Sequence, residues 1–172
     1  KKNTQPGNTL RLLRILLLDD SDAEVYLPAA KAGELAVPGT FMFTFDDVPP
    51  ERLGGSSAEA FRRGFLGLDS LGWGTLVTIA EVSDADRQAA LDRLTAVFID
   101  RFGAPDEAAA RTQAEEELAF VDRLCERPVN TILSLERSIG EDDNVEEQFH
   151  THEQPQASWE TPHPVVRIIP EA

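Results

Sequence analysis

The spacing of hydrophobic residues along the chain predicts strands in its first half. Residues 10–19 are apolar on both faces of an extended segment, which is typical of a central or covered strand. Residues 41–45 read Phe-Met-Phe-Thr-Phe, so a strand would place three phenylalanines on one face. Residues 75–82 are rich in β-branched side chains and predict a further strand that is buried on both sides.

A different spacing, in steps of three and four residues, predicts two helices after residue 82. Ser83 and Asp86 stand three residues apart, as in a capping box, and Gly103 ends the first helix. Pro105 suits the first turn of the second helix, so the joint is very short and the pair forms an antiparallel hairpin. The predicted buried stripes are Leu91, Leu94, Phe98 and Phe102, then Ala110, Ala114, Leu118, Val121 and Cys125.

The last third of the chain returns to strand patterns. Residues 131–138 and 145–152 predict two strands, and the short acidic loop between them indicates a β-hairpin. Residues 165–169 predict a last strand, which would pair with a sheet edge of this chain or of a neighbouring one.

Strands, then two long helices, then strands again indicate an α+β fold. We expect an antiparallel β-sheet of about five to six strands, with the antiparallel helical hairpin packed on one face. The phenylalanines of residues 41–45 would meet the apolar stripes of the helices. Residues 10–153 form this single domain, residues 1–9 precede it as a disordered segment, and residues 154–172 follow as a proline-rich arm.

Charge narrows the range of expected partners. The 172 residues include 31 acidic and 16 basic side chains, for a net charge of −15, and the basic residues are scattered along the sequence. Such a field repels nucleic-acid backbones and anionic membrane surfaces, so we expect neither as a partner. The single cysteine, Cys125, excludes an internal disulfide framework and a cysteine-rich zinc site. No apolar run is long enough for a membrane span, and we expect a cytoplasmic protein.

Residues 64–77, GFLGLDSLGWGTLV, are the most unusual stretch of the sequence. The glycines precede a strand instead of opening a helix, no lysine follows them, and Ser70 has the wrong spacing for a nucleophile elbow. A dinucleotide fingerprint, a phosphate loop and a hydrolase nucleophile are therefore excluded. Two interpretations remain: glycines that a tight chain reversal requires, or a ligand pocket lined by Phe65, Ser70 and Trp73.

His150 and His152 would share one face of their predicted strand. With Glu146 as a third ligand they could hold a divalent metal; no other cofactor is predicted. The same pattern also fits an amphipathic strand whose polar face is solvated. Arg62 and Arg63 offer a similar choice, between holding an anionic group and forming salt bridges in so acidic a chain.

Two further groups in the helices have plain structural interpretations. The consecutive glutamates at residues 115–117 fan around their helix, so they predict a solvated face and no convergent site. Cys125 falls on the apolar stripe, which predicts an inert, buried thiol.

Four short phrases link the sequence to a known group of proteins. They are GELAVPG at residues 33–39, AFRRGFLG at 60–67, RFGAP at 101–105 and AEEE at 114–117. With these phrases the chain resembles, over about residues 10–152, a small bacterial family that is known as a domain of unknown function. The resemblance implies a bacterial, cytoplasmic protein, and it supplies no catalytic or binding residue.

The residues together favour a non-enzymatic binding or accessory protein that acts through protein–protein contacts or self-association. No set of residues has the spacing of a nucleophile, a base and an orienting group, while the C-terminal arm and the aromatic glycine segment offer interaction surfaces. The alternative is a metal- or small-molecule-dependent enzyme. Its site would be His150, His152 and Glu146, or the pocket at Phe65, Ser70 and Trp73.

Overall fold

The computed structural model describes residues 10–44, 53–141, 144–152 and 166–169. Its strands are β1 (Arg11–Leu16), β2 (Leu35–Val37), β3 (Phe65–Gly67), β4 (Trp73–Gly74), β5 (Leu76–Glu81), β6 (Ile132–Ile139), β7 (Val145–His152) and β8 (Val166–Ile169). Its helices are α1 (Ser21–Val25), α2 (Phe41–Thr44), α3 (Gly55–Arg63), α4 (Asp84–Phe102) and α5 (Glu107–Leu124).

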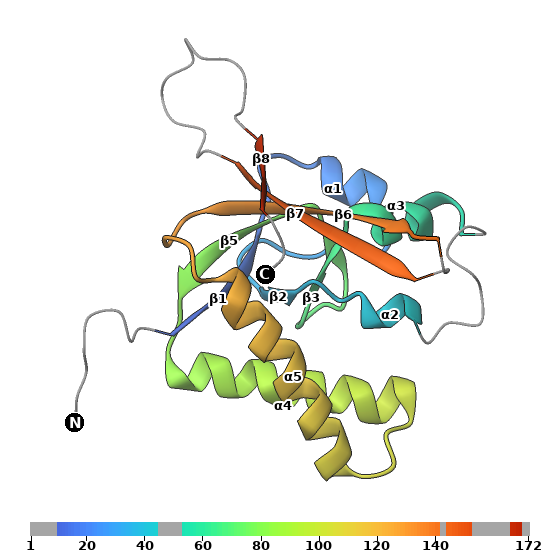
Figure 1. The fold of residues 1–172 in the computed structure, drawn as a ribbon, viewed down its shortest axis with the longest axis vertical. Coiled ribbons are helices and arrows are strands. Elements are labelled where there is room, and N and C mark those ends of the chain that lie inside the picture. The colour runs from blue at the N-terminus through green and yellow to red at the C-terminus, as the bar shows by residue number, and fades with distance from the viewer. Residues whose placement is uncertain (1–9, 45–52, 142–143, 153–165, 170–172) are drawn as a thin grey trace.

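The strands form one antiparallel sheet in the order β4-β3-β2-β1-β5-β6-β7-β8, which confirms the α+β class with more strands than the five to six expected (Figure 1). The predicted hairpin is present, since β6 and β7 pair from Ile132 opposite His152 to Ile139 opposite Val145. The predicted last strand is also present, as β8, and it pairs with β7 of the same chain.

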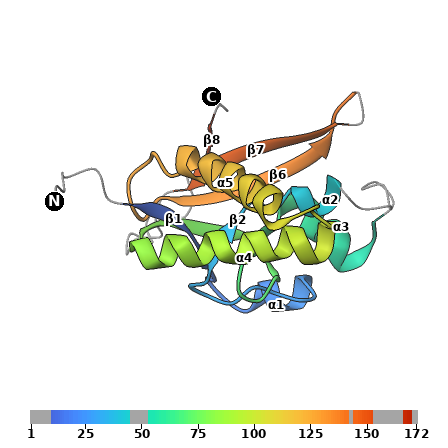
Figure 2. The same cartoon turned by 90° about the horizontal axis from the view of Figure 1, so that it is seen from below.

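The helical hairpin forms as its termini predicted. The Ser83 hydroxyl accepts from Asp86 N–H and the Asp86 carboxylate accepts from Ser83 N–H, which completes the capping box. Gly103 ends α4 in the left-handed conformation, at φ 62°. The two helices lie together on one side of the sheet, nearest the viewer in Figure 2, where Phe120 of α5 packs against Phe149 of β7.

Residues 41–44 are a helix, so the strand predicted for residues 41–45 is wrong within the described residues; Phe45 lies outside them. Gly39 has a positive φ of 77°, which turns the chain directly after β2. Met42 N–H and Phe43 N–H then donate to the carbonyls of Gly39 and Thr40, and these bonds begin a helical turn.

The packing of the two phenylalanines explains why the alternating pattern misled. The ring of Phe41 lies 4.7 Å from that of Phe98 on α4, so the expected contact with the helical stripe is confirmed for this residue. The ring of Phe43 instead packs on Phe61 of α3 and Trp73 of β4. A strand would send both side chains to one face, whereas the core requires them in two directions.

The glycine-rich segment contains a tight β-hairpin, β3–β4, at one edge of the sheet. A side chain on Gly67 would overlap the Glu34 carboxylate, and one on Gly72 would come within 2.5 Å of the Ala29 backbone. These glycines are needed for close approach, which supports the chain-reversal interpretation.

The turn of that hairpin is organised by a buried carboxylate from another part of the chain. Glu34 accepts hydrogen bonds from Lys31 N–H, Asp69 N–H, Ser70 N–H and the Ser70 hydroxyl, at 2.6 to 2.9 Å. Burial alone would raise the pKa of Glu34, but these hydrogen bonds outweigh it and lower that pKa below its ordinary value. The ionised carboxylate therefore stabilises the fold.

Replacing Glu34 with glutamine should lower the free energy of unfolding at neutral pH by about 1–3 kcal/mol, because the charge-assisted bonds weaken. Since the folded-state pKa is lowered, this contribution is present above the unfolded-state pKa and is lost as the pH falls through the folded-state value. Urea unfolding across the acidic range measures it. A gap between wild type and Glu34→Gln that stays constant down to acid pH would contradict this role.

Candidate functional site

The three residues predicted to line a pocket in the glycine segment have separate contacts. Phe65 is fully buried, with its ring 6.4 Å from that of Phe149, and Trp73 is buried against Phe43. The Ser70 hydroxyl donates to Glu34, and it also accepts from Gly72 N–H. A ligand pocket at Phe65, Ser70 and Trp73 stays a prediction, and each of these side chains already has partners within the protein.

The residues predicted to bind metal share one face of β7 but do not converge. His150 Nε2 lies 3.5 Å from Glu136 Oε1, and His152 Nε2 lies 2.7 Å from the Ser134 hydroxyl. Glu146 is four residues from His150, which is about 13 Å along a strand, too far to complete the site. Among the described residues, no three His, Cys, Asp or Glu side chains are grouped to hold a metal ion. Metal binding stays a prediction without a third ligand.

Of the two structural predictions for the helices, the one for Cys125 is confirmed, and the one for residues 115–117 is wrong at one position. Cys125 is buried, as predicted, and burial raises the pKa of its thiol to about 12, so the thiol is protonated at neutral pH. Glu115 and Glu116 are exposed, but Glu117 is not, so the solvated face predicted for residues 115–117 is wrong at its last position. Glu117 accepts a hydrogen bond from Gly39 N–H, and burial raises its pKa to about 7.

Two adjoining cavities form a groove beside α3. The first, which we call the α1 cavity, has a volume of about 340 Å³ and lies between α1, α3 and the start of β5. The second, which we call the histidine cavity, has a volume of about 390 Å³ and lies between α3 and the β6–β7 hairpin. Arg63, Thr75 and Leu76 line both cavities.

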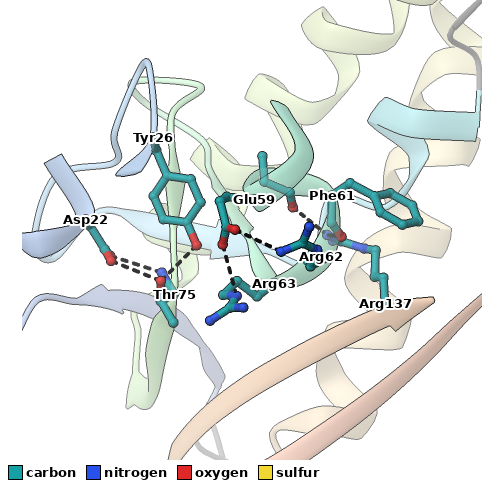
Figure 3. A network of polar contacts seen from close by, with 9 residues as sticks. Asp22, Tyr26, Glu59, Phe61, Arg62, Arg63, Thr75 and Arg137 are labelled. Carbon is teal, nitrogen blue, oxygen red and sulfur yellow. Dashed lines mark hydrogen bonds and ion pairs between the residues drawn. The ribbon is translucent and has the colours of Figure 1, made fainter. Parts of the chain in front are cut away.

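A chain of hydrogen bonds fixes α1 to the sheet at the α1 cavity (Figure 3). Asp22 accepts from the backbone N–H of Thr75 at 3.0 Å and from its hydroxyl at 2.9 Å. The Thr75 hydroxyl hydrogen is thereby used, so the Tyr26 hydroxyl must donate to Thr75, over 2.8 Å. Burial raises the pKa of Tyr26, which keeps this donor protonated. The cavity wall is therefore preorganised.

Exposed hydrophobic side chains gather at the α1 cavity. Among the described residues the large exposed hydrophobics are Leu18, Val25, Leu27 and Ile99, and the first two line this cavity. Leu27 directly follows Tyr26 and is 85% exposed, although its backbone N–H is held by the Ser56 hydroxyl at 2.7 Å. Two carboxylates of this segment, Asp19 and Asp22, also line the cavity, and Asp20 and Glu24 lie beside them in the sequence. The edge of the cavity is thus apolar and acidic.

The α3 wall of the groove carries a small ion cluster, also drawn in Figure 3. Glu59 lies 3.0 Å from Arg62 Nη1 and 3.3 Å from Arg63 Nε. The salt-bridge alternative for the two arginines is therefore present, with one carboxylate shared by two guanidinium groups.

The position of α3 depends on Arg137, which the sequence reasoning missed. Its side chain is completely buried and donates to the carbonyls of Pro38, Ala60 and Phe61 and to the Thr40 hydroxyl. Burial lowers the pKa of Arg137 to about 10, so it is charged at neutral pH. Two of these carbonyls end α3, so the guanidinium ties that helix to β6 and sets the wall of the groove (Figure 3).

A signal for this network was present in the strand patterns. Arg137 falls on the same face of β6 as Leu133 and Leu135, where an apolar residue is expected. Glu147 interrupts the apolar face of β7 in the same way, and the hairpin register sets it opposite Arg137. The two charges lie 3.9 Å apart. Two opposite charges on apolar faces of a predicted hairpin indicate a buried ion pair.

Comparison with protein-family models identifies the family of this chain. A model described as a family of unknown function, DUF6505, matches residues 10–162. The chain belongs to the DUF6505 family. The expected resemblance over about residues 10–152 is confirmed, and the match to DUF6505 covers both cavities of the groove while β8 lies beyond it. No curated protein and no solved structure matches the chain. In the part of the chain that the structure describes, no helix is long and apolar enough to cross a membrane.

Proposed function

We propose that this protein is a non-enzymatic binding or accessory protein, and that it takes a segment of a partner protein at the α1 cavity. The observation that carries the proposal is the exposure of Leu18 and Val25 on the lining of one cavity, together with the exposure of Leu27 directly after Tyr26, which also lines it. Exposed large hydrophobics that gather at a hollow are typical of interaction sites, whereas isolated ones need no explanation.

The chemistry of the cavity edge defines the partner. Apolar side chains offer a surface for an aliphatic or aromatic anchor, and the carboxylates of residues 19–24 favour a lysine or arginine beside it. We therefore propose a partner segment in which an apolar residue is flanked by basic residues. The net charge of −15 would attract such a segment from a distance.

The preorganisation of the site supports binding. Thr75 links Asp22 to Tyr26, and Glu59 is shared by two arginines, so the polar groups of the wall hold one another in place. A preorganised surface loses less conformational entropy when a partner binds. We place this function in the bacterial cytoplasm, as the resemblance implies, and propose a protein partner in preference to nucleic acid because of the acidic charge.

The double variant Leu18→Ser, Leu27→Ser should lose binding to peptides that the wild-type protein selects from a random display library. We expect the selected sequences to share an apolar residue next to lysine or arginine. The variant should bind them at least about tenfold more weakly, because it truncates two anchor contacts and each truncation costs about 1 kcal/mol or more. Fluorescence anisotropy with the selected peptides measures the change.

Ile99→Ser is the matched control, since it removes an exposed hydrophobic of α4 that lines neither cavity. This variant should bind as the wild type does. Selected peptides without a basic–apolar motif, or equal binding by the double variant, would contradict the proposal. Light scattering tests the oligomeric state. If the wild type is a dimer and the double variant Leu18→Ser, Leu27→Ser is a monomer, the occupant of the α1 cavity is a second copy of the chain and not a different protein.

A further inference from the structure

The histidine cavity differs in charge from the rest of this acidic protein. Arg62 and Arg63 line it from α3, and Glu136 is its only carboxylate among the described residues that line it. The Glu136 side chain is 68% exposed, so solvent screens its charge. Glu59 offsets one of the two guanidinium charges from the side of the α1 cavity. The cavity is therefore free of the negative excess that the net charge of −15 gives the chain as a whole.

Hydrogen-bond donors remain available in this cavity. Among the described residues, Arg63 is paired through Nε, which leaves its two terminal nitrogens to donate. Arg62 is paired through Nη1 alone. If His152 carries its proton on Nε2, it donates to Ser134, and the Ser134 hydroxyl hydrogen is then free to point into the cavity. These are charge-assisted and hydroxyl donors from two facing elements, α3 and β6.

We propose that the histidine cavity binds the phosphate group of a small phosphorylated molecule, held by Arg62 and Arg63 and by the Ser134 hydroxyl. Guanidinium groups bind phosphate oxygens through paired N–H donors, which makes arginine the preferred residue for such groups. The volume of about 390 Å³ lies in the range of small-molecule sites and leaves room for more than the phosphate itself. This site is separate from the α1 cavity, although the two share Arg63.

Titration of the full chain with inorganic phosphate and with pyrophosphate, at constant ionic strength, tests the proposal. We expect saturable shifts of the His150 and His152 imidazole signals in NMR spectra. Arg63→Gln should weaken phosphate binding by about tenfold or more, since a hydrogen bond to a charged group contributes about 1.5–3 kcal/mol. Ser134→Ala should weaken it by a smaller factor.

Arg93→Gln is the matched control, because Arg93 is 51% exposed and paired with Asp69, close to the 49% exposure of Arg63. It should bind phosphate as the wild type does. Equal weakening by Arg93→Gln, or shifts without saturation, would reduce the effect to an adventitious ion only and overturn the proposal. Binding of a phosphoserine peptide without binding of either free anion would overturn the small-molecule form.

The outcome is distinguishable from that of the peptide experiment. Leu18→Ser, Leu27→Ser removes no donor of the histidine cavity, so the double variant should bind phosphate as the wild type does. If it loses phosphate binding, the two sites are not separate and the proposal fails. If phosphate binding persists while no peptide is selected, the phosphate site stands and the proposed protein-binding function fails.

Discussion

Arg137→Met should lower the free energy of unfolding at neutral pH by about 3–5 kcal/mol, the largest loss that we expect from a single substitution in this protein. Methionine fills a similar volume but donates no hydrogen bond, so the carbonyls of Pro38, Ala60 and Phe61 lose their buried donor. Glu147 also loses its nearby positive charge. Urea denaturation measures the loss, and hydrogen exchange should show the first openings at α3.

Two further variants keep this result interpretable. Arg137→Lys retains the charge without the planar fork of donors, and we expect an intermediate loss of stability even if the methionine variant does not fold. Arg93→Met removes a surface ion pair and should cost no more than about 1 kcal/mol. Equal unfolding energies for Arg137→Met and Arg93→Met would show that the buried network does not hold α3.

Glu117→Gln should make the protein more stable than the wild type above neutral pH, by up to about 3 kcal/mol. Burial raises the folded-state pKa of Glu117 from 4.5 to about 7. Between these two values the folded protein holds a proton that the unfolded chain has lost, so wild-type stability falls as the pH rises through this window. Glutamine is neutral throughout and can still accept the hydrogen bond from Gly39.

Unfolding midpoints measured from pH 4 to pH 8 test this prediction, and Glu116→Gln provides the control on the exposed side of α5. The Glu117→Gln curve should meet the wild-type curve at the acidic end and lie above it at the basic end. Glu34 acts with the opposite sign and in a more acidic window, so the two effects separate along the pH axis. Parallel curves for Glu117→Gln and wild type would contradict the raised pKa.

The helices show how far local patterns reach. The capping box at Ser83 and the left-handed Gly103 are set by residues close together in the sequence, and the structure confirms both. The buried stripe of α5 is confirmed for the same reason, because helical spacing alone decides which side chains share a face. The β6–β7 hairpin could be predicted equally well, since a short loop fixes both the partner and the register of its strands.

The groove could not be predicted from local sequence patterns. Its walls come from α1, α3 and four strands, which meet only after the sheet has formed, and its α3 wall is held by Arg137 from a distant part of the chain. The sequence left two interpretations for Arg62 and Arg63, an anion-binding site or salt bridges. It could not show that both arginines pair with Glu59 on a cavity wall.

The α+β class, the helical hairpin, the strand hairpin and the acidic charge could all be predicted from the sequence, because each depends on composition or on neighbours a few residues apart. Tertiary structure alone decided that residues 41–44 form a helix, since Phe41 and Phe43 pack in two directions. It also decided that Glu117 is partly buried beside Gly39 and that Leu18 is exposed on the lining of a cavity. Burial is a property of the assembled chain, and the pKa values and the binding surface follow from it.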